Sequence, residues 1–324
     1  MTERVQNDLP LFSFRLLVVL LFVFTGSVTA QDPDEVVRID TELVSFEVTV
    51  TDKAGRPVRN LTVDDFRIFD AGTEKRIDFF QPIRRDHGRP LSVVFALDVS
   101  GSMTEDELGR LRSAMQNFIS RLADYNSYFA VVSFAMEVKT LQGFTNRRDK
   151  LEKSFDKLIR DQDGLSTHAY DAVDDSIRLI ARKSPKVIQG KMPKRAVILV
   201  SDGFPVGDVV TPETLIERAN AAETSVYSVI LPSFSRLQGD RRPVLTPLEA
   251  SGLIERTGGR SFYATDRSFD ALFQSLAEEI TASYAIAIYP ESGEKSNEGK
   301  SRKVTISSKA GFTVRQNRTE YKIK

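Results

Sequence analysis

Short apolar runs alternate with segments of helical periodicity through the middle of the chain. The clearest runs, residues 92–97 and 196–200, contain almost no polar residue, which is typical of strands covered on both faces of a sheet. Between such runs, apolar residues recur every three or four positions, a spacing that predicts amphipathic helices. The pattern places strands at 92–97, 128–134, near 138, 196–200, 225–231 and 261–264, and helices at 104–122, 147–159, 168–183, 212–223, 248–256 and 269–280. This alternation predicts an α/β fold, a doubly wound and mostly parallel Rossmann-like sheet over residues 91–283.

Further strands are predicted on both sides of this region. Residues 43–51 alternate between apolar and polar positions, as in a half-buried strand. The same kind of pattern predicts strands at 66–69, 77–80, 284–289, 302–307, 312–315 and 321–324. Neither set is large enough to be stable alone. We therefore expect residues 36–84 and 284–324 to form together a second, smaller all-β sandwich domain, with the α/β domain (residues 91–283) inserted between its halves.

Two basic segments have the composition of connections. Residues 84–90 are rich in arginine with glycine and proline, which indicates a linker into the α/β domain. Residues 183–195 contain lysine and arginine but no acid, so we expect a solvated loop there.

Residues 1–30 have the pattern of a secretory signal peptide. Basic residues precede the apolar run 16–24, and residues 28–30 form a small-x-small cleavage site. The run is short for a membrane span. We therefore expect an exported protein, periplasmic or secreted, with no membrane span after cleavage. An uncleaved N-terminal membrane anchor is the alternative.

The composition narrows the chemistry available to the chain. Its 324 residues include 45 basic and 45 acidic side chains, so the charge balance gives no reason to expect nucleic acid as a partner. The absence of cysteine excludes disulfides, thiol nucleophiles and zinc–thiolate sites. Only two histidines, His87 and His168, are present, which is too few for a histidine-rich metal site.

Oxygen-bearing side chains follow the predicted strands at one end of the sheet. Asp98, Ser100 and Ser102 come directly after the first buried strand, and Asp202 follows the strand 196–200. Thr167 precedes the helix that enters from the same edge. Loops at the carboxyl ends of parallel strands lie together, and this is where ligands bind in open α/β sheets. Carboxylate and hydroxyl oxygens are hard ligands that suit Mg²⁺, Ca²⁺ or Mn²⁺.

The segments FALDVSGSM, GLSTHAYDAV and ILVSDG resemble the von Willebrand factor type A (VWA) domain family over about residues 91–283. They contain, in order, the D-x-S-x-S…T…D pattern of the family's metal-ion-dependent adhesion site (MIDAS). His168 departs from the family, which tends to place a small residue after the threonine. The resemblance implies that a divalent cation is held by Asp98, Ser100, Ser102, Thr167 and Asp202. Mg²⁺ is the first expectation, with Mn²⁺ or Ca²⁺ as alternatives.

The resemblance also implies a function. In the family the metal completes a protein–protein contact and performs no reaction, so we expect an exported protein of adhesion type, not an enzyme. Its protein partner would present an Asp or Glu to the metal. The residues predicted to form the partner-binding rim around the metal are Met103, His168, Phe204, Arg236, Arg241 and Arg242.

A hydrolase is the alternative function. It would use Ser100 or Ser102 with His168 as the base, or a metal-bound water. The chain has no G-x-S-x-G motif, and no further carboxylate is evident as a base over the metal.

Overall fold

The computed structural model describes residues 43–83, 89–101, 104–122, 126–161, 167–231, 245–264, 269–290 and 300–322. The predicted signal peptide, residues 1–30, lies outside them. None of the helices in these ranges is both long and apolar enough to cross a bilayer.

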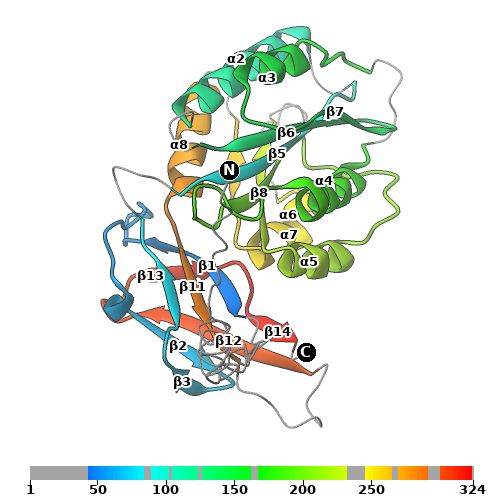
Figure 1. Cartoon of the computed structure of the whole chain (residues 1–324). Coiled ribbons are helices and arrows are strands. Elements are labelled where there is room, and N and C mark those ends of the chain that lie inside the picture. The colour runs from blue at the N-terminus through cyan, green and yellow to red at the C-terminus, as the bar shows by residue number, and fades with distance from the viewer. Residues whose placement is uncertain are drawn as a thin grey trace, which may run out of the picture. The chain divides into compact units, whose positions relative to one another are not determined.

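Six strands form one sheet in the middle of the chain (Figure 1). Five are parallel, and only the edge strand β7 runs antiparallel to its neighbour β6. In sheet order they are β10 (Ser261–Tyr263), β9 (Thr224–Ile230), β8 (Lys194–Ser201), β5 (Leu91–Asp98), β6 (Tyr128–Phe134) and β7 (Val138–Thr145). All eight residues of β5 are buried, as the apolar run predicts.

Helices cover both faces of this sheet, so β5 contributes to two separate cores. Val93, Phe95 and Leu97 pack against α2 (Glu105–Arg121), α3 (Arg148–Phe155) and α8 (Phe269–Thr281). The opposite face, with Val94 and Ala96, is covered by α4 (Ala169–Lys183), α5 (Pro212–Ala221), α6 (Pro247–Ala250) and α7 (Leu253–Arg256). The predicted doubly wound α/β fold is therefore confirmed.

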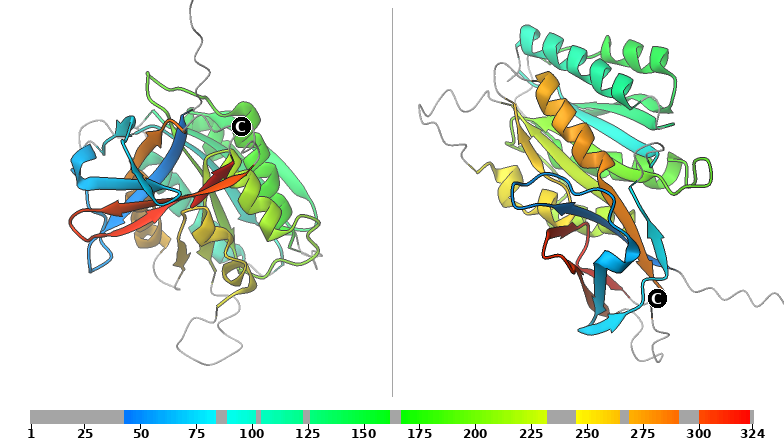
Figure 2. Two further views of the ribbon diagram at one scale, coloured as in Figure 1. Left: turned by 90° about the horizontal axis from the view of Figure 1, so that it is seen from below. Right: turned by 90° about the vertical axis from the view of Figure 1, so that its left-hand side faces the viewer.

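The N- and C-terminal segments together form two antiparallel sheets. One has the order β13 (Thr313–Gln316), β1 (Val44–Thr51), β11 (Ser283–Ile288), β4 (Phe79–Gln81). The other has the order β14 (Glu320–Lys322), β12 (Ser301–Ser308), β2 (Phe66–Asp70), β3 (Thr73–Lys75), and a 3₁₀ turn, η1 (Val63–Asp65), precedes β2. Apolar residues of both sheets, among them Phe46, Ile68, Tyr284 and Val304, share one core. This confirms the predicted β-sandwich from both ends of the chain. Figure 2 shows α8 running directly into the central strand β11.

Several predicted elements differ in extent from those observed. The helix expected at 147–159 ends at Phe155, and the helix expected at 248–256 is two short helices, separated at Gly252 with φ 72°. The strand expected near Val138 extends to Thr145. The strand β3 was not predicted, because its sequence, TEK, has no apolar residue.

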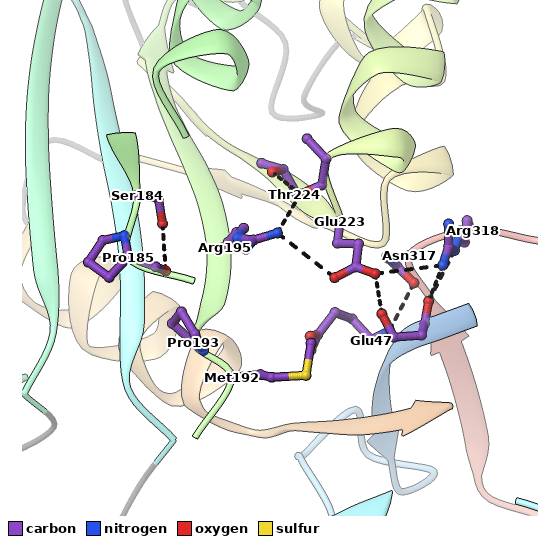
Figure 3. Close-up of polar contacts among 12 residues, drawn as sticks. Glu47, Ser184, Pro185, Met192, Pro193, Arg195, Glu223, Thr224, Asn317 and Arg318 are labelled. Carbon is purple, nitrogen blue, oxygen red and sulfur yellow. Dashed lines mark hydrogen bonds and ion pairs between the residues drawn. The ribbon is translucent and has the colours of Figure 1, made fainter. Parts of the chain in front are cut away.

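Polar contacts join the sandwich to the amino end of the α/β sheet, and Figure 3 shows those around Glu47 and Glu223. Arg89, predicted to lie in a linker, is buried; its guanidinium donates to Glu47 at 2.6 Å and to the carbonyl of Met192 at 2.7 Å. Glu47 also exchanges two backbone-amide hydrogen bonds with Asn317, at 2.9 and 3.0 Å. The polar face of β1 is therefore buried as well as its apolar face.

More ion pairs cross the same junction. Glu223 hydrogen-bonds the Ser45 hydroxyl and lies 3.9 Å from Arg195 and from Arg318. Arg315 of β13 pairs with the buried Glu279 of α8. The contacts of Glu223 with Ser45 and Arg318, and of Glu279 with Arg315, join the two units by compensated charge. The pair of Arg195 and Glu223 lies within the α/β unit.

Candidate metal centre

The first predicted ligand, Asp98, ends the buried strand β5 and is itself buried. Its Oδ1 accepts a hydrogen bond from the backbone amide of Ser100 at 2.9 Å, and this contact turns the chain away from the sheet. Ser100 is also buried. Two more hydrogen bonds hold this loop in place. The backbone amide of Asp161 donates to the carbonyl of Val99, and the Arg160 guanidinium donates to the carbonyl of Gly101. No sequence motif indicates a role for Arg160.

The second predicted carboxylate, Asp202, follows the neighbouring strand β8 and is buried. The Ser201 hydroxyl donates to Asp98 Oδ2 at 2.9 Å and lies 3.5 Å from Asp202 Oδ1, so one hydroxyl links both carboxylates. Gly203 then adopts φ 87°, and a Cβ there would lie 2.8 Å from the Thr246 side chain. Glycine is therefore required directly after the second carboxylate.

Two buried carboxylates this close perturb each other. Burial raises the pKa of Asp98, repulsion from Asp202 adds to the rise, and hydrogen bonds from Ser100 and Ser201 oppose it. The resulting pKa of Asp98 is about 6. Each described hydrogen-bond partner of Asp98 is a hydroxyl or a backbone amide, and none carries a positive charge. Such a site fits a divalent cation, whose charge would compensate both acids.

Thr167 lies in the adjacent loop, at the start of α4. Its backbone pairs with Val206, four residues after Asp202, through hydrogen bonds of 3.1 and 3.0 Å. The amide of His168 donates to the carbonyl of Ala135, after β6. The structure therefore places the loops of Asp98, Thr167 and Asp202 at the carboxyl edge of the same sheet.

A reciprocal pair of carboxylates holds two of these loops together. Asp171 of α4 accepts hydrogen bonds from the amides of Val209 and Val210, and Asp208 accepts one from the amide of Asp171. Burial alone would raise the pKa of Asp171, but hydrogen bonds from His168 and from the two valine amides outweigh it and leave the pKa below its usual value. We call Asp171 and Asp208 the carboxylate clasp.

His168 belongs to this clasp as well as to the predicted rim. Its Nδ1 lies 3.0 Å from Asp171 Oδ2, and His168, Asp171 and Asp208 could bring three ligand atoms within 4.8 Å of one another. Hydrogen bonds from backbone amides already account for the orientation of the Asp171 and Asp208 carboxylates. We therefore assign these two acids to the positioning of the loops. The sequence signal for the clasp is weak, because 37 residues separate its two members.

The comparisons with known proteins agree with this geometry. The family model of the von Willebrand factor type A domain matches residues 92–278, which is more than half of the chain. The chain belongs to this family. No curated protein matches the chain significantly.

Solved structures similar to this VWA protein include proteins from bacteria and from a mussel. BatB from Bacteroides thetaiotaomicron is 20% identical, with a TM-score of 0.41, over 59% of this chain and 97% of that one. The vWF domain of the type V pili tip protein Mfa5 from Porphyromonas gingivalis is 15% identical, with a TM-score of 0.42, over 60% and 95%. Proximal thread matrix protein 1 from the mussel byssus, with a zinc-occupied MIDAS motif, is 14% identical, with a TM-score of 0.47, over 62% and 48%. At these values the family assignment rests on the sequence match.

Several predicted residues lie outside the part of the VWA domain that the structure describes. These are the ligand Ser102 and the rim residues Met103, Arg236, Arg241 and Arg242. Phe204 is half-buried, and its amide donates to Asp202 Oδ1 at 3.1 Å. The full ligand set and the rim therefore stay predictions.

Proposed function

We propose that this protein binds a protein partner through a divalent cation held at the carboxyl edge of the α/β sheet. The observation that carries the proposal is the pair of buried carboxylates, Asp98 and Asp202, joined by the Ser201 hydroxyl. Leaving two acids buried side by side is unfavourable unless a cation compensates them.

Only two of the proposed ligands would be charged, and all of them would be hard oxygen donors. The two acids would be joined by the hydroxyls of Ser100, Ser102 and Thr167. With only two carboxylates, a bound Mg²⁺ would keep a net positive charge and open coordination positions. An Asp or Glu of a partner would be attracted to such a position. The chain's own residues supply the binding and orientation, and no reaction is required.

The proposal also includes export of the protein. The signal pattern at residues 1–30 would place the protein in the periplasm or outside the cell, where partners of an adhesion-type protein are found. The absence of cysteine means that stability there depends on the two apolar cores of the α/β sheet and on the sandwich core.

Cation binding can be tested directly by isothermal titration of the full chain with Mg²⁺, Mn²⁺, Ca²⁺ and Zn²⁺. We expect at least one cation to bind, and Asp98→Ala to abolish binding. The matched control is Asp52→Ala, which removes a half-buried acid that pairs with Arg56 in the turn after β1, away from the sheet edge. Unchanged cation binding in Asp98→Ala would show that the site is wrong.

Partner binding is tested by capture from native envelope extract with and without EDTA. Proteins that are retained by the wild type and lost both in EDTA and in Asp98→Ala would support the proposal. Retention that is indifferent to both would contradict it.

The hydrolase alternative has less support. The Nδ1 of His168 contacts Asp171, as the Nδ1 of a catalytic histidine contacts its orienting acid. Asp171, however, also accepts hydrogen bonds from the backbone amides of Val209 and Val210, so its role in the clasp already explains its position. Turnover of generic ester or phosphate substrates that is lost in His168→Ala, with cation binding intact, would favour an enzyme.

A further inference from the structure

We infer that the partner's metal-binding acid is flanked by apolar side chains, because the loops next to the candidate metal site carry exposed apolar side chains. This inference rests on the proposed function and specifies the kind of partner. The apolar rim consists of Met136, Ile159, Val206, Val209 and Leu245.

Backbone hydrogen bonds show that the rim residues lie in loops that touch one another. Asp161 donates to Val99, which places Ile159 beside the loop of Asp98. The carbonyl of Ala135, next to Met136, accepts the amide of His168. Val206 pairs with Thr167, and the amide of Leu248 donates to Gly203 on the far side of Asp202. The loops therefore enclose the candidate ligands from several directions.

The side chains of the apolar rim are largely exposed to solvent. They are 52% to 85% exposed, and they make up five of the eleven large apolar side chains that are exposed in the described residues. Water contact at this many apolar residues around one site is unfavourable in a free protein and is typical of a surface that a partner covers. In contrast, the candidate ligands Asp98, Ser100 and Asp202 are buried.

This difference in depth indicates a protein as the occupant. An acid that reaches the buried ligands must project below the rim, as a side chain on a protruding loop does. The residues on either side of that acid then lie against the rim, and burial of both surfaces favours apolar neighbours. A small carboxylate would leave the rim exposed.

The charges that flank the apolar rim do not form a basic surface for anionic lipids. Glu137 follows Met136 directly and pairs with Lys139 at 2.9 Å, and Glu105 opens α2 after the loop of Asp98; all three are exposed. Anionic lipid headgroups are attracted by clusters of basic side chains, and these positions do not supply one. We therefore commit to a protein loop that presents one acid between apolar residues.

The test is a selection of displayed, disulfide-constrained random peptides on the cation-loaded full chain, eluted with EDTA. We expect the enriched peptides to carry Asp or Glu next to Leu, Ile, Val or Phe. Enriched peptides with an acid between polar residues would overturn this inference but leave the proposed function standing. If EDTA elutes no enriched peptide, both fail together.

A variant test uses the strongest peptide as a probe in fluorescence anisotropy. Met136→Ser/Ile159→Ser should weaken its binding about tenfold, because two apolar contacts are lost. Cation affinity, measured by titration, should not change. The matched control, Val63→Ser/Val187→Ser, removes two exposed valines that lie away from this edge and should bind the peptide as the wild type does. Equal peptide affinity in both variants would overturn the inference. So would cation-dependent binding to phosphatidylglycerol vesicles that is stronger than binding to the peptide.

Discussion

Buried acids at the two ends of the same α/β sheet differ in the charge of their partners. At the amino end, Glu47 pairs with Arg89 at 2.6 Å and Glu279 pairs with Arg315. At the carboxyl end, Asp98 and Asp202 share the Ser201 hydroxyl, and the described partners of Asp98 are neutral donors. The amino end therefore carries its own compensating charge, whereas the described partners of Asp98 at the carboxyl end supply none.

This difference distinguishes buried acids that stabilise the fold from buried acids of the proposed binding site. A buried acid with a resident guanidinium contributes to holding two units together. We expect a buried acid without one to contribute to a site that a bound cation completes.

The largest loss of stability should come from Arg89→Met at the amino end. Glu47 would remain buried with no guanidinium, and removing one partner of a buried ion pair typically costs about 3–5 kcal/mol. Urea unfolding followed by circular dichroism measures the loss. Arg56→Met, in an exposed pair, should cost less than about 0.5 kcal/mol. The double variant Arg89→Met/Glu47→Leu should recover most of the loss, and failure to recover would show that the Glu47 charge is not the cause.

Cation binding should stabilise the carboxyl end only. At a free Mg²⁺ concentration about 100 times the dissociation constant, the free energy of unfolding should rise by about 2.7 kcal/mol. Asp98→Asn should show no such rise. Without cation, Asp98→Asn should unfold no more easily than the wild type, because the amide removes a buried charge. A large loss of stability in that variant without cation would contradict the contrast between the two ends.

A smaller effect is expected from Gly203→Ala. The left-handed φ of 87° costs about 1–2 kcal/mol for a residue with a Cβ, and the Thr246 side chain must move. Because Gly203 follows Asp202, cation affinity should fall as well. Gly109→Ala, in the open surface of α2, should be neutral or slightly stabilising. Normal cation affinity in Gly203→Ala would show that this turn does not position the carboxylate.

The smallest effect is expected at the carboxylate clasp. Asp171→Asn keeps one acceptor but loses the charge that binds the amides of Val209 and Val210, at a cost of about 1 kcal/mol. Cation affinity, measured by titration, should fall about tenfold, because the loops of Thr167 and Asp202 are held less firmly. Asp175→Asn, one turn further along α4, is the matched control and should leave affinity unchanged.

The α/β fold was predictable because its signal is local. Runs such as residues 92–97 and 196–200 are apolar on both faces, and each helix carries its own periodic stripe. The order of oxygen residues after β5 and β8 pointed to the carboxyl edge for the same reason. The proposed domain limits, 36–84, 91–283 and 284–324, stay predictions.

The junction between the two units was not predictable in this way. Arg89 and Lys194 lie in segments that read as a linker and a solvated loop, yet both are buried. A buried charge has no periodicity, and its partner can be distant in the sequence: Glu47 lies 42 residues before Arg89. The clasp was missed for the same reason. Charge pairs of this kind become visible only when the elements that carry them are placed in space.

The direct passage from α8 into β11 has a mechanical consequence. Thr281 ends the helix and Ser283 begins the central strand of a sandwich sheet, so one residue separates them. The chain also crosses between the units before β5, near Arg89. A tensile load applied to the carboxyl edge is thus shared by two segments of chain, one continuous with the inner strand β11 and the other following the edge strand β4, and no single tether has to bear it.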